Sequence, residues 1–501
     1  MRSGFRNTIR GILHSGPGQS CRRSGAPTGI YLAPVFGQFR PMFRLVTLPL
    51  WLFVLILLFA AVTFASNFLF PSVRWFFRRR MERAVARLNR NLKRPIAPFK
   101  LARRHDMVER LVYDPAVAEA AAAHARRTGE PGAVAFQLAR RYAREIVPAF
   151  SATVYFGFGA RVSRWLSHSF YNVRIGAGTG SPLDLIPPEA AVVYVMNHRS
   201  NMDYVLVTHL VSDEATLSYA VGEWAHFWPV SWLIRAMGAY FIQRRSRRGP
   251  LYRCVLERYV QMATESGDPQ AVFPEGGLSL DGRIAPPRHG ILGYICEGAE
   301  ESGRDVAFVP VALNYDRVIE DRFLVEAAAE NRRSFHLPWG YVVGGALRHV
   351  GRRLMGRKHP FGTASVAFGA PVMLSSLDAE ERHSPEWLAR RLMEGIAAVV
   401  PVLPVPLVAW IRQAGESRTH DDLVGELGVI CRDLSRRGIP VPRREPEVAV
   451  ADALALLSRR GVVTDENGVI RATADGAPLL AYYAASIAHH VESDAESCCV
   501  D

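Results

Sequence analysis

The sequence predicts an α/β fold: a mostly parallel layered sheet with flanking helices, a helical N-terminal region, a mainly helical C-terminal region and one N-terminal membrane helix. Three observations support this prediction. Short, continuous apolar runs rich in β-branched residues recur in the middle of the chain, with helical patterns between several of them. The flanking regions carry apolar residues at helical spacing, and one early stretch of 22 residues has no charge. With 501 residues, 49% of them hydrophobic, the chain can bury more than one core.

The uncharged stretch runs from Leu45 to Ser66, and we assign residues 45–70 to a transmembrane segment, because about 20 apolar residues cross a bilayer core as a helix. An interfacial or re-entrant helix is the alternative. Residues 1–44 contain arginines and no acidic residue, which is typical of a disordered basic tail, although a transit peptide has a similar composition. The denser arginine cluster after the stretch favours a cytoplasmic position for the rest of the chain.

The chain has a formal net charge of +14, from 61 basic and 47 acidic side chains. A basic surface favours anionic partners, such as membrane phospholipids, CoA phosphates or nucleic acid, although a solvated basic face without a dedicated partner has the same composition. The six cysteines are scattered without a CxxC pair. They indicate neither a disulfide framework nor a zinc site, and we expect no metal.

Residues 74–180 form the predicted helical N-terminal region. An alanine-rich stretch, AVAEAAAAHARR, and a second stretch with apolar residues at helical spacing, AVAFQLARRYAREIV, both favour helices. The sequence Gly-Glu-Pro-Gly at 129–132 predicts a break between these two helices.

Residues 181–375 form the predicted α/β domain. Its apolar runs are typical of strands that helices cover on both faces, and Leu251–Ser266 is typical of a helix between two of them. The predicted strands are Ala190–Met196, Ala271–Phe273, Val306–Leu313, Tyr341–Val343 and Ala364–Phe368.

Residues 380–495 form the predicted C-terminal helical region, which contains one hairpin. Ser384-Pro385 predicts a helix start with an N-cap and a proline at the first helical position. Thr419 and Asp422 resemble a capping box, and Asn467-Gly468 predicts a hairpin turn. Helices and a hairpin in a basic chain also occur in winged-helix DNA readers. This hairpin is neither basic nor aromatic, so we expect no nucleic acid partner.

A candidate catalytic pair follows the first predicted strand. His198 lies in the loop after that strand, where open α/β sheets place their ligand sites, and Asp203 comes five residues later. This spacing lets the carboxylate fold back to the imidazole, fix its tautomer and stabilise the imidazolium. The chain lacks a GxSxG nucleophile elbow, so the pair suits deprotonation of a substrate hydroxyl. On its own, the same spacing also occurs in purely structural histidines.

Two further segments accompany this pair. In AVFPEGG, another strand end meets Glu275, Gly276 and Gly277, where glycines allow backbone N–H groups to approach an anion. Between the two strands, an apolar run from Gly238 ends in Arg244 and a second arginine.

These ordered segments strongly resemble the four sequence blocks of the glycerolipid acyltransferase family, which is marked by a His-x-x-x-x-Asp motif. More narrowly, they look like the bacterial and mitochondrial glycerol-3-phosphate acyltransferases. The blocks correspond to His198–Tyr204, Gly238–Arg245, Phe273–Gly277 followed by Gly282-Arg283 and Pro286–Gly290, and the strand around Pro310. The likeness continues in Val399–Ala409 and Tyr482–His489.

The resemblance implies transfer of an acyl group from acyl-CoA or acyl-carrier protein to the 1-hydroxyl of glycerol 3-phosphate. Residues 181–375 would then be the acyltransferase catalytic domain, facing the cytoplasm. His198 would be the general base and Asp203 its partner. Arg244 would bind the phosphate of the acceptor. No cofactor or metal is implied, because a thioester already has a good leaving group.

The resemblance also implies roles for residues around the pair. Glu275, Gly276 and Gly277 would help to position the acceptor, and Pro310 would shape the acyl or CoA side.

The chain departs from the family pattern after the EGG turn. The family continues with arginines there, whereas this chain has Leu278 and Leu280. Arg283 and Arg288 would substitute, or the acceptor would differ. The alternatives are therefore a lysophosphatidic acid or dihydroxyacetone-phosphate acyltransferase and, in another class, a non-catalytic membrane lipid-binding protein.

Overall fold

The computed structural model describes residues 49–64, 70–176, 181–222, 230–242, 249–332, 361–413 and 418–492. The predicted tail of residues 1–44 and the predicted strand Tyr341–Val343 lie outside the described residues. The chain divides into two units, Met1–Phe77 and Arg78–Asp501. The first contains an apolar helix, and the second contains the sheet.

The apolar helix, α1 (Leu50–Phe64), covers part of the predicted transmembrane segment. It has 15 residues and no charge, and all its side chains except the half-buried Leu52 are exposed. At 1.5 Å per residue the helix is about 22 Å long, whereas a bilayer core is about 30 Å thick. None of the described helices is long and apolar enough to span a bilayer, so the structure does not support the predicted transmembrane helix.

The helical N-terminal region is largely as predicted. The break at residues 129–132 is confirmed, because α5 ends at Thr128 and Gly129 adopts a left-handed conformation with φ +72°. Residues 172–175, however, form a strand rather than part of a helix. The helices of this region are α2 (Phe70–Asn91), α3 (Pro98–Leu101), α4 (Arg104–Val112), α5 (Pro115–Thr128), α6 (Gly132–Ile146), α7 (Ala152–Val154), the π-helix η2 (Tyr155–Gly159) and α8 (Ala160–Phe170).

The main sheet has eight strands in the described part of the chain, ordered β1-β7-β6-β2-β5-β3-β4, with β8 also paired to β6. The strands are β1 (Asn172–Ile175), β2 (Ala191–Met196), β3 (Ser218–Val221), β4 (Tyr240–Phe241), β5 (Gln270–Val272), β6 (Val306–Tyr315), β7 (Thr363–Phe368) and β8 (Val372–Met373). In the order of the sheet, the neighbouring strands β6, β2, β5, β3 and β4 are all parallel to one another.

The sheet is mixed, so the prediction of a mostly parallel sheet was wrong. Strands β7 and β8 both run antiparallel to β6, and they follow one another along the same edge of this long strand. Pro310 lies between the two pairings, where its missing N–H costs no ladder hydrogen bond, and its carbonyl accepts from Gly369 N at 2.8 Å. An apolar run indicates that a strand is buried, but it does not fix the direction of its partner.

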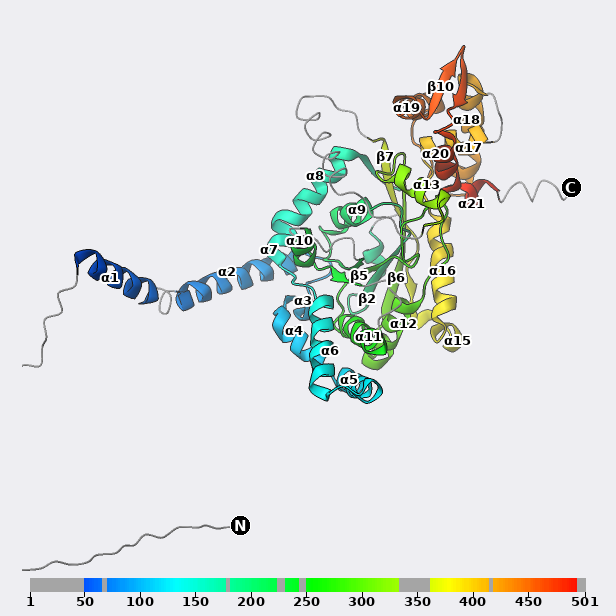
Figure 1. The fold of residues 1–501 in the computed structure, drawn as a ribbon. Coiled ribbons are helices and arrows are strands. Elements are labelled where there is room, and N and C mark those ends of the chain that lie inside the picture. The colour runs from blue at the N-terminus through cyan, green and yellow to red at the C-terminus, as the bar shows by residue number, and fades with distance from the viewer. Residues whose placement is uncertain are drawn as a thin grey trace, which may run out of the picture. The chain divides into compact units, whose positions relative to one another are not determined.

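Helices cover both faces of the sheet, as the continuous apolar runs predicted. Successive strand side chains point to opposite faces, so β2 contributes Val193 and Val195 to one core and Tyr194 and Met196 to the other. The first core packs against α5, α6, α11 (Pro250–Glu265), α12 (Gly290–Ser302) and α16 (Pro385–Ala398). The second packs against α8, α9 (Met202–Val211), α13 (Asp321–Ala329) and the C-terminal helices. Figure 1 shows α11 and α12 on one side of the strands and α8 and α9 on the other.

The C-terminal region confirms three local predictions. Ser384 caps α16, Thr419 and Asp422 form a capping box, and Asn467-Gly468 makes a hairpin turn in which both residues have positive φ. The elements after β8 that have not yet been given are η5 (Leu374–Ser376), α15 (Ala379–Arg382), α17 (Pro404–Gln413), β9 (Arg418–Thr419), α18 (His420–Arg436), α19 (Pro446–Arg459), β10 (Val463–Glu466), β11 (Val469–Ala472), α20 (Ala477–Ala485) and α21 (Ala488–Val491). The short elements η3 (Pro182–Leu185) and α10 (Val230–Ala236) lie before β2 and β4.

Candidate active site

Four parallel strands, β2, β3, β4 and β5, end at the same edge of the sheet, which we call the carboxyl edge. His198 follows the end of β2, and Glu275 follows the end of β5. Parallel pairing therefore brings together two residues that are 77 positions apart. Strand β4 ends at Phe241, shortly before Arg244, which lies outside the described residues.

The structure brings His198 and Asp203 together, as their five-residue spacing predicted. His198 Nδ1 lies 2.9 Å from Asp203 Oδ2, and the two side chains are 2% and 0% exposed. Asp203 lies in the first turn of α9, where the helix dipole stabilises a carboxylate. Because Nδ1–H donates to the carboxylate, Nε2 is the imidazole nitrogen that can accept a proton.

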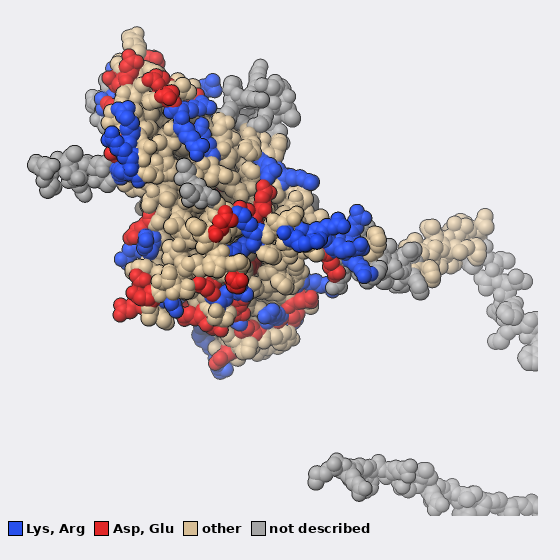
Figure 2. All heavy atoms as spheres, turned by 180° about the vertical axis from the view of Figure 1, so that it is seen from behind, with Lys and Arg blue, Asp and Glu red and all other residues tan. Residues whose placement is uncertain are grey.

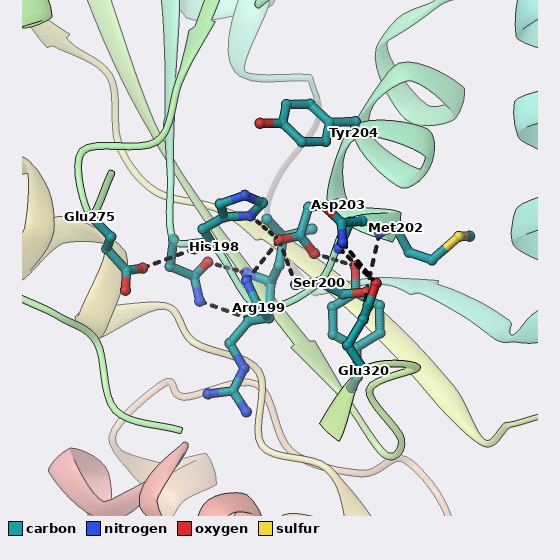
Figure 3. A network of polar contacts seen from close by, with 12 residues as sticks. His198, Arg199, Ser200, Met202, Asp203, Tyr204, Glu275 and Glu320 are labelled. Carbon is teal, nitrogen blue, oxygen red and sulfur yellow. Dashed lines mark hydrogen bonds and ion pairs between the residues drawn. The ribbon is translucent and has the colours of Figure 1, made fainter. Parts of the chain in front are cut away.

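The Asp203 carboxylate is the centre of the polar network (Figure 3). Its Oδ2 accepts from the backbone N–H groups of Arg199, at 2.7 Å, and Ser200, at 3.0 Å, in addition to the imidazole. Its Oδ1 accepts from the phenol O–H of Tyr315 at 2.6 Å. These donors fix the orientation of the carboxylate and satisfy its buried charge.

Glu275 braces the loop that carries the imidazole. Its two oxygens accept from His198 N at 2.8 Å and from Ala285 N at 3.0 Å. Burial raises the pKa of Glu275 from 4.5 to about 7, although the two N–H groups and the charge of Arg199 oppose this rise. The sequence predicted that Glu275 helps to position the acceptor, and the structure shows that it binds the backbone of the loop that carries His198.

A second carboxylate, Glu320, holds the other half of the same loop. Its Oε2 accepts from Ser200 Oγ at 2.7 Å, and its Oε1 accepts from Asn201 Nδ2 at 3.1 Å. Burial raises the pKa of Glu320, and these hydrogen bonds oppose the rise. Sequence reasoning missed Glu320 because it lies 120 positions from Ser200.

Tyr315 was also missed, although the sequence holds a signal for it. Asn314, Tyr315 and Asp316 are three polar residues at the end of the otherwise apolar β6, and all three are buried. Buried polar side chains need partners, so such a cluster at a strand end points to a polar network.

Aromatic rings surround the imidazole. The Phe273 ring centroid lies 4.2 Å from that of His198, and the Tyr204 ring centroid lies 5.5 Å away in an edge-on arrangement. The main-chain carbonyl of His198 accepts from Ser279 N at 2.9 Å. The imidazole is therefore held from both sides and through its own backbone.

The arginines near the site have three different environments. The Arg199 side chain extends away from the imidazole, donates to the Gly282 carbonyl, and lies over the Tyr482 ring at 5.1 Å (Figure 3). The exposed Arg283 pairs with Glu492 at 3.6 Å. The third arginine, Arg288, is exposed.

The EGG turn brings an exposed arginine to the site. Gly276 has φ +69°, and a Cβ there would lie 2.8 Å from Cδ of Arg288, so the arginine stem covers the glycine. The neighbouring Gly277 is half-buried. Leu278 and Leu280 are half-buried and pack against the core, so the two leucine positions have an apolar role here.

Among the described residues, Pro310 makes no hydrogen bond or ring contact with His198, Asp203 or the residues that bind them. Its ring packs against Gly369 and Gly395, where a Cβ would lie only 3.1 Å from the proline ring. The described residues also contain no group of three or more histidine, cysteine or acidic side chains that could hold a metal ion.

Two known family models match the chain. The Acyltransferase family model matches residues 181–314, and the model of the glycerol-3-phosphate acyltransferase C-terminal region matches residues 350–500.

The chain is also similar to curated proteins named glycerol-3-phosphate acyltransferase. It is 31% identical to that of Pseudomonas putida (strain GB-1) over 353 residues, which are 66% of this chain and 41% of the relative. The protein of Pseudomonas putida (strain W619) is 31% identical over 78% of this chain and 43% of its own length. That of Xylella fastidiosa (strain M12) is 27% identical over 84% and 51%. The chain thus spans about half the length of these relatives or less.

Among solved structures, the chain is similar to the 1-acyl-sn-glycerophosphate (LPA) acyltransferase of Thermotoga maritima. The identity is 21%, the match covers 48% of this chain and 75% of the other, and the TM-score is 0.30. This likeness is too partial to carry an argument.

Proposed function

Because the chain belongs to the glycerolipid acyltransferase family, we propose that it transfers a fatty acyl group to the 1-hydroxyl of glycerol 3-phosphate in phospholipid biosynthesis. The donor is acyl-CoA or acyl-carrier protein. The observation that carries the proposal is the buried contact between His198 Nδ1 and Asp203 Oδ2, which leaves Nε2 as a base at the carboxyl edge.

In the proposed reaction, His198 Nε2 takes the proton of the acceptor hydroxyl as its oxygen attacks the thioester carbonyl. A C–O bond forms, and the negative charge moves to the carbonyl oxygen. The C–S bond then breaks, and the imidazolium returns the proton to the leaving thiolate. Asp203 stabilises the imidazolium between these two steps. Because His198 is only 2% exposed, its surroundings must give way when the substrates bind.

Two arginines are proposed to bind the acceptor phosphate. Arg244 matches the second family block and follows β4, which ends at the carboxyl edge. Arg288 is exposed and covers Gly276 beside the base-bearing loop. A planar guanidinium suits bidentate contact with phosphate. Arg283 is a weaker candidate because it pairs with Glu492.

We also propose that the enzyme works at a membrane surface, with the catalytic domain on the cytoplasmic side of the cell inner membrane. Helix α1 exposes apolar side chains along its whole length. Helix α2 exposes a set of basic side chains, which Figure 2 shows gathered in blue: Arg79, Arg80, Arg83, Arg87 and Arg90. An apolar helix followed by a basic one favours an anionic lipid surface.

The variant His198→Ala of the full chain tests the function. Transfer of labelled palmitate from palmitoyl-CoA should fall at least about 100-fold, because the base is lost. The matched control is His383→Ala, the same change at an exposed histidine. Both variants should keep the wild-type circular dichroism spectrum, although loss of the buried ring should lower the unfolding midpoint of His198→Ala. Substantial residual transfer in a folded His198→Ala protein would refute the role of the base.

A panel of acceptors in the same assay tests the substrate. Glycerol 3-phosphate should be acylated faster than dihydroxyacetone phosphate or lysophosphatidic acid. Preference for either of the other two would assign the chain to the corresponding alternative activity. Lipid binding without transfer to any acceptor would favour a non-catalytic lipid-binding protein.

A further inference from the structure

Tyr315 ends β6, and its phenol O–H donates to Asp203 Oδ1 at 2.6 Å. The tyrosine is fully buried. The other oxygen of the carboxylate, Oδ2, already faces three N–H donors, whereas Tyr315 is the donor that the described residues provide to Oδ1.

We propose that Tyr315 is a positioning residue for the His198–Asp203 pair. The inference rests on the proposed acyl transfer, because it concerns the pair that carries that reaction. The tyrosine comes from β6, whereas the histidine lies in the loop between β2 and α9 and the aspartate in the first turn of α9, so the tyrosine ties the pair to a separate strand.

The first effect of the phenol is on orientation. The terminal torsion of an aspartate is broad, so a carboxylate bound on one oxygen alone can rotate. A donor on each oxygen fixes the plane of the group. In this chain the fixed plane directs Oδ2 of Asp203 toward the imidazole Nδ1.

The second effect is on charge. A hydrogen bond to Oδ1 draws part of the negative charge away from the imidazole. Without the phenol, Asp203 Oδ2 would carry more of the negative charge and would stabilise the imidazolium more strongly. The titratable and charged groups that surround the pair are Arg199, Tyr204, Glu275, Tyr315, Glu320 and Tyr482.

The variant Tyr315→Phe removes the hydroxyl and keeps the ring. The pH dependence of kcat/KM is measured on the full chain with glycerol 3-phosphate. The acidic limb of this profile should move to higher pH by about 0.5 to 1 pH unit. At the wild-type optimum, kcat should fall about tenfold with little change in KM for the acceptor, because the phenol does not touch it.

The matched control is Tyr171→Phe. Tyr171 is also a buried tyrosine, and its ring centroid lies 5.3 Å from that of Tyr315. Its O–H donates to the Arg317 carbonyl at 2.8 Å rather than to the catalytic pair. The control loses the same atom from the same aromatic cluster, so it should change stability by a similar amount and leave the pH profile in place.

Each outcome decides the question. A shifted acidic limb in Tyr315→Phe and an unshifted one in Tyr171→Phe support the proposal. Equal profiles in both variants and the wild type would overturn it while leaving acyl transfer intact. Failure of Tyr315→Phe to fold, when Tyr171→Phe folds, would also overturn it, since the phenol would then be structural. A wild-type chain inactive with every acceptor would refute the proposed function itself.

Discussion

Because the carboxyl of Glu275 is buried, we predict that removing its charge makes the chain more stable at high pH but slower in acyl transfer. The variant Glu275→Gln replaces it with a neutral group of the same shape, which resembles the protonated acid. The amide keeps one acceptor oxygen, so only one of the backbone N–H groups of His198 and Ala285 stays paired. At neutral and higher pH, wild-type Glu275 is the better brace for the loop, although its charge is buried.

The size of the effect follows from the pKa. In the folded chain the pKa of Glu275 is about 7, against 4.5 for an unburied group. Between these values the folded chain keeps a proton that the unfolded chain releases, so the free energy of unfolding falls as pH rises through this window. From pH 5 to pH 8 the wild type should lose about 2 to 3 kcal/mol that Glu275→Gln does not lose.

Urea unfolding of the full chain in detergent at pH 5 and pH 8 measures this difference. The matched control is Glu394→Gln, the same change at an exposed position of α16. Subtracting the wild-type values removes the other groups that titrate in this range, such as Asp316, whose pKa burial raises to about 6. At pH 8, Glu275→Gln should be more stable than the wild type but about tenfold slower in transfer, because one loop hydrogen bond to a charged acceptor is lost.

A constant difference in unfolding free energy between Glu275→Gln and the wild type at the two pH values would refute this reasoning. It would mean that Glu275 ionises as easily in the folded chain as in the unfolded one. Higher stability at pH 8 with unchanged transfer would be a separate result. It would keep the electrostatic argument and reject the bracing role.

Two further predictions concern a glycine and the apolar helix. Gly282 has φ +89°, and a Cβ there would lie 1.9 Å from the Tyr482 carbonyl oxygen. Gly282→Ala should therefore destabilise the chain by well over the roughly 1 kcal/mol expected for the control Gly468→Ala, because Gly468 has φ +82° but faces open space. Urea unfolding measures the loss in both variants, and equal losses would reject the clash at Gly282. Replacing both Leu55 and Leu58 of α1 with glutamate should lower co-flotation with anionic vesicles at least tenfold, because each leucine that enters the lipid contributes about 1.5–3 kcal/mol to binding. Unchanged flotation would argue against attachment through α1.

The sequence predicted those parts of the fold that depend on local pattern. The long strands β2 and β6 were found because each contains a continuous apolar run. The caps of α16 and α18 were found because three or four neighbouring residues define a cap. The two-residue β4 and the four-residue β3 were missed, because so short a segment shows no period. The mostly parallel sheet was wrong for another reason: the direction in which two strands pair depends on contacts between distant segments.

The same distinction separates the two halves of the candidate site. His198 and Asp203 are five positions apart, so a local turn can bring them together, and spacing alone predicts the contact. Tyr315 lies 112 positions from Asp203, and only the pairing of β6 beside β2 places it there. Distance along the chain therefore decides which partners of a catalytic pair a single sequence can reveal.

The end of β6 joins the catalytic pair to the C-terminal region. The Asn314 amide donates to the Pro401 carbonyl at 2.9 Å, and Asp316 Oδ1 accepts from Val405 N at 3.0 Å. Tyr315, between them, donates to Asp203. The residues on either side of Tyr315 therefore bind α17 and the residue Pro401 shortly before it, while Tyr315 itself binds the aspartate. A displacement of α17 would therefore move the same backbone that sets the Tyr315 hydroxyl, and the C-terminal region helps to hold the geometry of the His198–Asp203 pair.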